Sequence, residues 1–129
     1  MAVRGIRGAT TSTENTSEAI QAATKDLLIA ILDQNPELST VDIGSVIFTV
    51  SEDLTAEYPA HAARELGWNE VPLLCAREIP VTKSLTRCIR VLIHWNTDLV
   101  QSEIQHVYLG EASILRPDIR RDRSISVKK

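Results

Sequence analysis

Residues 87–95 read RCIRVLIHW, which has the composition of a buried β-strand with one charged residue inside it. Apolar residues flank Arg90 on both sides, and the β-branched ones among them favour strands. A guanidinium keeps its charge in proteins, and burying it without a partner is unfavourable. We therefore expect the Arg90 side chain either to reach water or to meet an anionic group.

Outward from this stretch, short segments rich in β-branched residues predict further strands. Together with 87–95, the predicted strands are 3–10, 45–51, 71–79 and 106–115, the last one interrupted by Gly110. The Gly-Ala-Thr-Thr run at 8–11 is expected to turn the chain at the end of the first strand.

Two main helices are predicted between these strands. Asn15 is expected to cap the first one, with Glu18 completing a capping box, and Asn35-Pro36 is expected to end it. Apolar residues at helical spacing give this helix one apolar face. The second helix is expected to begin near Pro59 and to end at Gly67. Single helical turns are predicted at 39–42 and 101–105.

The predicted elements indicate an α+β fold, in which a mixed five-stranded sheet packs with two main helices. The 129 residues suffice for one domain, which we place at 1–118, followed by a basic tail at 119–129. Residues 1–115 carry a net charge of −7, whereas residues 116–129 carry +4. An acidic body disfavours nucleic acid as a partner. A sheet with so few helices leaves a face or an edge to cover, so self-association is expected.

The composition also indicates where the protein works. No apolar run approaches the ~20 residues of a membrane span, and the N-terminus lacks the apolar region of a signal peptide. Cys75 and Cys88 each lie in an apolar segment, as reduced core cysteines do. We therefore expect a cytoplasmic protein with no membrane partner.

Standard catalytic apparatus is missing from the sequence. The three histidines have no cysteine or carboxylate at metal-ligand spacing, so no metal is expected. No phosphate-binding glycine loop and no nucleophile elbow is present. What remains is a set of charged and polar residues at unusual places, namely Arg7, Arg64, Glu78, Arg90, Tyr108 and Arg116. Each of these has an ordinary explanation, such as a Glu78–Arg90 ion pair. Together they favour a small pocket for a ligand with several carboxylates.

Four separated motifs extend this interpretation. VRGIRGATT at the start, YPAHAARELGW in the middle, CIRV at 88–91 and HVYL with LRPD between 106 and 118 resemble the AroH-class chorismate mutases. The resemblance runs from residue 3 to about 118. It implies a homotrimer whose sheets form a pseudo-α/β barrel, with an active site at each subunit interface. It also implies the conversion of chorismate to prephenate, a step of phenylalanine and tyrosine biosynthesis, without cofactor or metal.

The resemblance further implies a role for each residue of the motifs. Arg90 would face the ether oxygen of chorismate, Arg7 and Tyr108 would bind the enolpyruvyl carboxylate, and Glu78 would accept a hydrogen bond from the ring hydroxyl. Cys75 and Leu74 would lie near the ring, and Arg116 with the tail would close over the ligand. The neighbouring subunit would add the residues of its YPAHAAREL motif, which are Tyr58, Ala60, His61 and Arg64.

Some positions depart from the family pattern. His61 stands where lysine is common, Tyr58 where phenylalanine is common and Leu74 where a polar residue is common. The loop at 81–85 lacks the expected glycine pair. Cys75 and Glu78 also differ in strand parity, so a regular strand points them to opposite faces. Both reach one pocket only through a bulge, a strand end or a backbone contact.

Two other functions stay open at this point. The chain could be a non-catalytic trimeric sensor of an aromatic-pathway carboxylate, in which case prephenate would bind without turnover. Alternatively, the basic tail could contact nucleic acid or a partner, in which case its deletion would abolish that binding.

Overall fold

The computed structural model describes residues 1–115, so Arg116, the domain end at 118 and the tail at 119–129 lie outside the described residues. The described part is α+β, as the sequence predicts. Five strands form one mixed sheet, in the order β3-β2-β4-β1-β5. The strands are β1 Ala2–Thr11, β2 Ile43–Val50, β3 Leu73–Arg77, β4 Cys88–Thr97 and β5 Val107–Tyr108.

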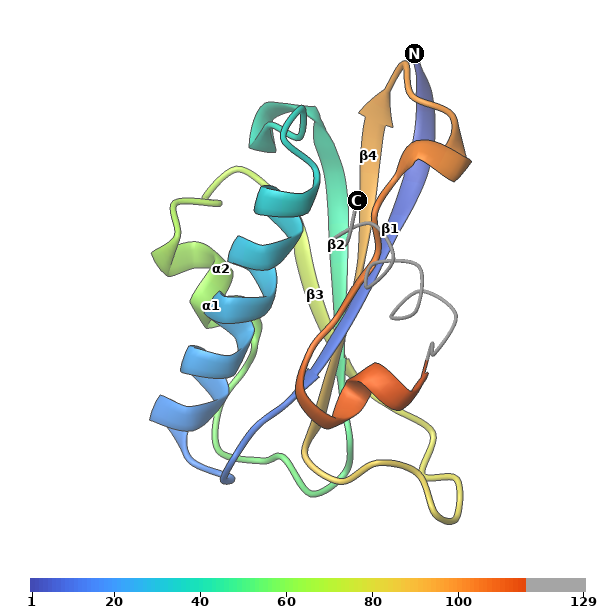
Figure 1. The fold of residues 1–129 in the computed structure, drawn as a ribbon. Coiled ribbons are helices and arrows are strands. Elements are labelled where there is room, and N and C mark those ends of the chain that lie inside the picture. The colour runs from blue at the N-terminus through green and yellow to red at the C-terminus, as the bar shows by residue number, and fades with distance from the viewer. Residues whose placement is uncertain (116–129) are drawn as a thin grey trace.

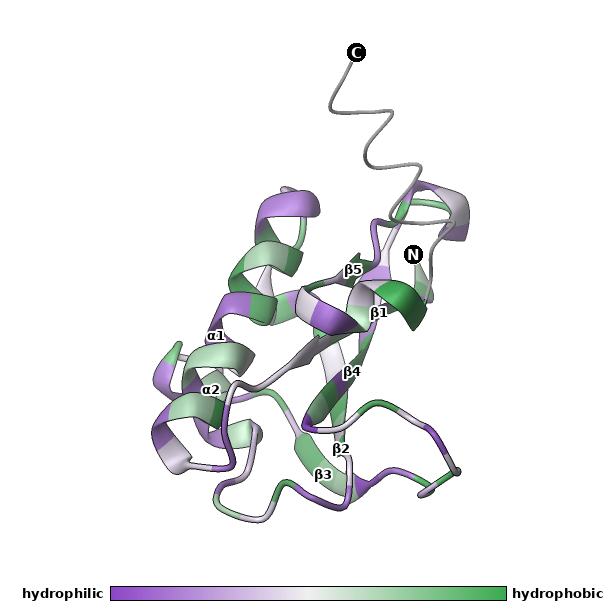
Figure 2. Ribbon diagram, turned by 60° about the horizontal axis from the view of Figure 1, so that its bottom comes forward, coloured by the Kyte–Doolittle hydropathy of each residue, from purple (hydrophilic) through white to green (hydrophobic). Residues whose placement is uncertain are grey.

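Most of the stretch at 87–95 lies in β4, the central strand of the sheet. It pairs antiparallel with β1 on one side and with β2 on the other, whereas β3 and β5 are parallel edge strands. The odd-numbered residues from Ile89 to Thr97 are buried, and the even-numbered residues from Arg90 to Asn96 are half-buried. Three of the four half-buried residues are polar, the exception being Leu92, and Figure 2 shows both hydrophilic and hydrophobic colours along β4. Arg90 thus points to a different face from the core.

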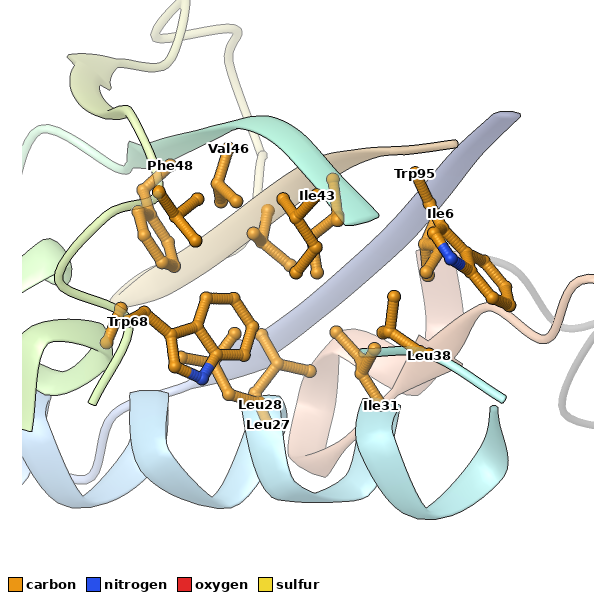
Figure 3. Close-up of a cluster of buried hydrophobic side chains, with 14 of the residues drawn as sticks. Ile6, Leu27, Leu28, Ile31, Leu38, Ile43, Val46, Phe48, Trp68 and Trp95 are labelled. Atoms are coloured by element: carbon orange, nitrogen blue, oxygen red, sulfur yellow. The ribbon is translucent and has the colours of Figure 1, made fainter. Parts of the chain in front are cut away.

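Both helices, α1 Ser17–Gln34 and α2 Ala60–Glu65, lie on the same side of the sheet (Figure 1). The core fills the space between α1 and the sheet, where Leu27, Leu28 and Ile31 meet Phe48 and Trp95 among others (Figure 3). No α-helix covers the other face of the sheet within residues 1–115. We call this surface the open face. Part of it near β5 is covered by the 3-10 helix Gly110–Leu115.

The start of α1 corrects one prediction. Asn15 is not the cap, because the Thr16 side chain accepts the hydrogen bond from the Ala19 N–H. Asn15 instead accepts the N–H groups of Thr55 and Ala56 through its Oδ1. It therefore ties the segment before α2 to the start of α1. The predicted helical turns at 39–42 and 101–105 are present as the 3-10 helices Thr40–Asp42 and Gln101–Glu103.

Two strand boundaries also differ from the prediction. The Gly-Ala-Thr-Thr run does not turn, because β1 continues to Thr11 in register with Cys88 of β4. The last strand contains only Val107 and Tyr108, and the residues from Gly110 to Leu115 form a 3-10 helix. Gly110 has φ +56°, a left-handed conformation that ends an extended strand and that favours glycine.

Candidate functional site

Arg90 meets both expectations in part, because its side chain is partly exposed and also lies beside a carboxylate. Its side chain is 30% exposed, yet its Nε is buried and has no hydrogen-bond partner among the described residues. The carboxylate of Glu78 forms an ion pair with it, with 3.6 Å between Nε and Oε2. This distance is too long for a hydrogen bond. Because a buried guanidinium N–H without a partner is costly, Nε is a donor available to an anionic ligand.

Glu78 lies one residue beyond the end of β3, where its backbone N–H donates to the carbonyl of Val50 over 2.8 Å. Its carboxylate Oε2 accepts a hydrogen bond from the hydroxyl of Thr49 over 2.6 Å. Thr49 is opposite Arg90 in the register between β2 and β4. No sequence pattern indicates Thr49, because only the strand register brings it to Glu78.

Arg7 and Tyr108 lie on the open face near Arg90. Arg90 pairs with Ala9 of β1, and Ala9 also pairs with Tyr108 of β5. Arg7 is two residues before Ala9, so its side chain shares that face. Arg7, Tyr108 and Arg90 together line a cavity of about 230 Å³. No ion pair neutralises Arg7 within residues 1–115.

A larger cavity of about 410 Å³ adjoins the first one at Arg90. Glu78, Cys88 and residues 79–86 line it, so Arg90 belongs to both cavities. Burial raises the pKa of the Cys88 thiol, and the nearby Arg90 guanidinium opposes this shift. Lys83 in the loop has φ +68°, a left-handed conformation that favours glycine, and it lies in the 81–85 segment that lacks the glycine pair. The loop thus bends without the glycine pair.

Cys75 lies on the helix side of the sheet, as its parity predicted. It pairs with Phe48 in the register of β2 and β3, and it packs against the main core. Leu74 pairs with Ile47, which lines the open-face cavity, and it is 60% exposed. Cys75 therefore does not share a cavity with Glu78 in this chain, whereas Leu74 shares the face of Arg90.

A second group of candidate residues gathers at the β3 edge of the sheet. Tyr58 and Cys75 line a hollow of about 390 Å³ there, and none of its lining residues also lines the cavities at Arg90. Ala60, His61 and Arg64 belong to α2, beside this hollow. Burial raises the pKa of the Cys75 thiol, although the backbone of Ala60 and the charge of Arg64 oppose the shift.

Glu57 anchors the segment that carries Tyr58 and His61. Its Oε2 accepts from the hydroxyl of Ser17 over 2.8 Å and lies 3.1 Å from Nδ1 of His61, and its Oε1 accepts from the N–H of Tyr58. The Ser17 hydroxyl and these other donors lower the pKa of Glu57 to about 2. His61 also lies 3.7 Å from a carboxylate oxygen of Glu65. Glu57 is not among the residues that the sequence predicts for the site.

No helix within residues 1–115 is long and apolar enough to cross a membrane.

The described residues offer no cluster of three or more histidine, cysteine, aspartate or glutamate side chains that could hold a metal ion. The side chains around Arg90, among them Arg7, Glu78 and Tyr108, offer fixed charges and hydrogen bonds. Such a site can bind a small polyanion and stabilise negative charge that develops on it.

Comparison with known proteins gives a consistent picture. The family described as chorismate mutase type I matches residues 3–119. The chorismate mutase AroH of Thermus thermophilus is 56% identical over 117 residues, which cover 91% of this chain and 96% of the relative. The chorismate mutase AroH of Bacillus subtilis (strain 168) is 44% identical over 120 residues, covering 92% and 94%.

The fold agrees as well. A solved structure of the chorismate mutase from Clostridium thermocellum superposes with a TM-score of 0.83 at 48% identity. The match covers 85% of this chain and 97% of that structure.

Proposed function

The chain belongs to the chorismate mutase type I family and isomerises chorismate to prephenate, and we propose that it does so in the pocket around Arg90. The observation that carries this proposal is the buried Nε of Arg90, which lacks a hydrogen-bond partner among residues 1–115. The non-catalytic sensor is not favoured, because both named relatives are chorismate mutases.

The reaction needs no nucleophile from the protein. Chorismate rearranges intramolecularly, as one C–O bond breaks and one C–C bond forms within the same molecule. No acid, base or metal has to take part. The protein has to hold the diaxial, near-attack conformer of a flexible dianion, and it has to stabilise the negative charge that grows on the ether oxygen.

Arg90 carries the central role in this proposal. Its free Nε donates to the ether oxygen, where negative charge is greater in the transition state than in the bound substrate. A fixed donor of this kind lowers the barrier rather than merely tightening binding. Because the donor has no competing hydrogen bond in residues 1–115, it does not have to break one before it meets the ligand.

The other residues of the open face bind the rest of the ligand. Arg7 and Tyr108, which line the same cavity as Arg90, bind the enolpyruvyl carboxylate. Glu78 accepts a hydrogen bond from the ring hydroxyl through Oε1, since Oε2 already accepts from Thr49. Leu74 lies on the same face and contacts the ring.

The neighbouring subunit completes the site. Tyr58 lines the hollow at the β3 edge, which is separate from the Arg90 cavities of its own chain, and Ala60, His61 and Arg64 follow it in α2. A second copy can bring them against the open face. Cys75 lines the same hollow as Tyr58, so we place it with this group. Arg116 and the tail then close over the bound dianion.

A homotrimer with a barrel-like core fits these requirements. Apolar side chains remain uncovered on the open face, where Val3 is 61% exposed and Leu74 60% exposed. Burying such residues against another subunit is favourable. The cytoplasm suits both the shikimate-pathway substrate and the two free cysteines.

The experiment that tests this function uses purified protein and chorismate. The loss of the diene absorbance gives the rate, and product analysis identifies prephenate. We expect loss of absorbance far above the uncatalysed rate, with prephenate as the product. Binding of prephenate without turnover would instead establish the sensor.

A further inference from the structure

Thr49 and Glu78 share one hydrogen bond at the centre of the site. The hydroxyl of Thr49 donates to Oε2 of Glu78 over 2.6 Å. This same oxygen is the one that lies 3.6 Å from Nε of Arg90. Thr49 lines the cavity of Arg7 and Tyr108, and it is directly opposite Arg90 in the sheet.

The bond controls how closely Glu78 approaches Arg90. Charge-assisted hydrogen bonds between an arginine and a carboxylate are normally about 2.7–2.9 Å long and often bidentate. The Glu78 backbone is fixed by its bond to Val50, so mainly the side-chain torsions decide where the carboxylate lies. With Oε2 bonded to Thr49, the carboxylate stays beside Arg90 without forming that hydrogen-bonded pair.

Such a pair would compete with the ligand. Two hydrogen bonds from the guanidinium to Glu78 would use donors that the ligand needs and would offset the positive charge. A carboxylate turned toward Arg90 would also withdraw Oε1 from the ring hydroxyl. Both effects would weaken the binding of the ligand, although every residue of the site would still be present.

We propose that Thr49 is a positioning residue of this enzyme, which holds Glu78 away from Arg90 and thereby keeps the arginine available to the substrate. The inference rests on the proposed site at Arg90. Thr49 acts through Glu78 and makes no contact with the reacting atoms in this account.

The test compares two substitutions at one position. Thr49→Val keeps the shape and the strand preference of threonine but removes the hydroxyl, whereas Thr49→Ser keeps the hydroxyl. A hydrogen bond to a charged group corresponds to a rate factor of about ten to a hundred. We expect Thr49→Val to lower kcat/KM by that factor, mainly through kcat, and Thr49→Ser to restore most of it. Circular dichroism and thermal unfolding check the fold, and Thr49→Ala replaces Thr49→Val if valine perturbs it.

A double-mutant cycle separates this role from a general structural one. In a Glu78→Ala background, Thr49→Val should change kcat/KM by less than about twofold, because the group that Thr49 positions is gone. Activity of Thr49→Val close to that of the wild type would overturn the inference. An equal loss with and without Glu78 would overturn it too. Failure of the wild-type protein to convert chorismate in the same assay would count against the proposed function instead.

Discussion

Arg90 and Glu78 face each other across 3.6 Å between Nε and Oε2, close enough for charge attraction and too far for a hydrogen bond. The central strand directs Arg90 away from the core, and the end of β3 delivers Glu78 beside it. The pair therefore holds the guanidinium in place without saturating its donors. We propose that this state leaves the arginine available to an anionic ligand.

The first prediction concerns the shared site. If each site takes Arg90 from one chain and Arg64 from the next, an Arg90→Ala chain and an Arg64→Ala chain are each inactive but complement each other. Random mixing at equal amounts should rebuild about a quarter of the interfacial sites. Turnover of chorismate is measured after the two variants are unfolded and refolded together.

Each variant refolded alone is the control for this experiment. A mixture that stays as inactive as its components would show that both residues act within one chain.

The second prediction concerns acid stability. The Ser17 hydroxyl, the Tyr58 N–H and His61 depress the pKa of Glu57 to about 2 from the ordinary 4.5. A carboxylate with a depressed pKa stabilises the folded state above its ordinary pKa, and this contribution is lost as the pH falls toward 2. Glu57→Gln should therefore lower Tm clearly at pH 6–7, and its Tm should converge with that of the wild type near pH 2.

Glu37→Gln is the matched control, because Glu37 is exposed and forms no hydrogen bond or ion pair in the described part of the chain. Its Tm should follow the wild type at each pH. A constant difference between Glu57→Gln and the wild type across this range would contradict the role given to the charge of Glu57.

The third prediction concerns the close contact between β1 and α1. A β-carbon at Gly8 would lie 3.0 Å from Cδ1 of Ile31 and 3.1 Å from Cγ1 of Val91, so these buried side chains would have to move by a few tenths of an ångström. Gly8→Ala should lower the free energy of unfolding by about 1–3 kcal/mol. Urea unfolding measures this change.

Gly5 provides the comparison in the same strand. A β-carbon there would meet only Cδ1 of Leu92, at 3.6 Å. We expect Gly5→Ala to change the free energy of unfolding by less than about 1 kcal/mol. If both substitutions changed the free energy of unfolding equally, the packing of α1 against Gly8 would not explain why glycine occupies position 8.

The fourth prediction concerns the basic tail. Residues 119–129 contain five basic residues and one acidic residue, and we propose that they cover the bound dianion. Deleting them should raise KM several-fold and change kcat much less, because the residues around Arg90 remain. Steady-state kinetics at low and high salt measure both constants. An unchanged KM would remove the tail from the site.

The face of the sheet on which a strand residue lies could be predicted from the sequence. The parity difference between Cys75 and Glu78 correctly predicted that their side chains lie on two faces of the sheet. This feature depends only on the period of two within one strand. The helices were predictable for the same reason, because their apolar spacing is local.

Features that depend on contacts between residues far apart in the sequence could not be predicted from the sequence. Thr49 meets Glu78 only because β2 and β3 pair in one particular register. Gly8 resembles a turn residue, yet it lies within β1 where side chains of α1 leave little room for a β-carbon. Asn15 and Thr16 are both good capping residues, and only the contact of Asn15 with the 55–56 segment decides between them.

The most direct test of the account is the turnover of chorismate by Arg90→Lys beside the wild type. Lysine keeps the positive charge but lacks the planar fork of donors that Arg90 presents. We expect a folded Arg90→Lys protein to lose at least about a hundredfold in kcat, as enzymes do when a donor to a developing negative charge is removed. Turnover close to that of the wild type would contradict the central role of Arg90.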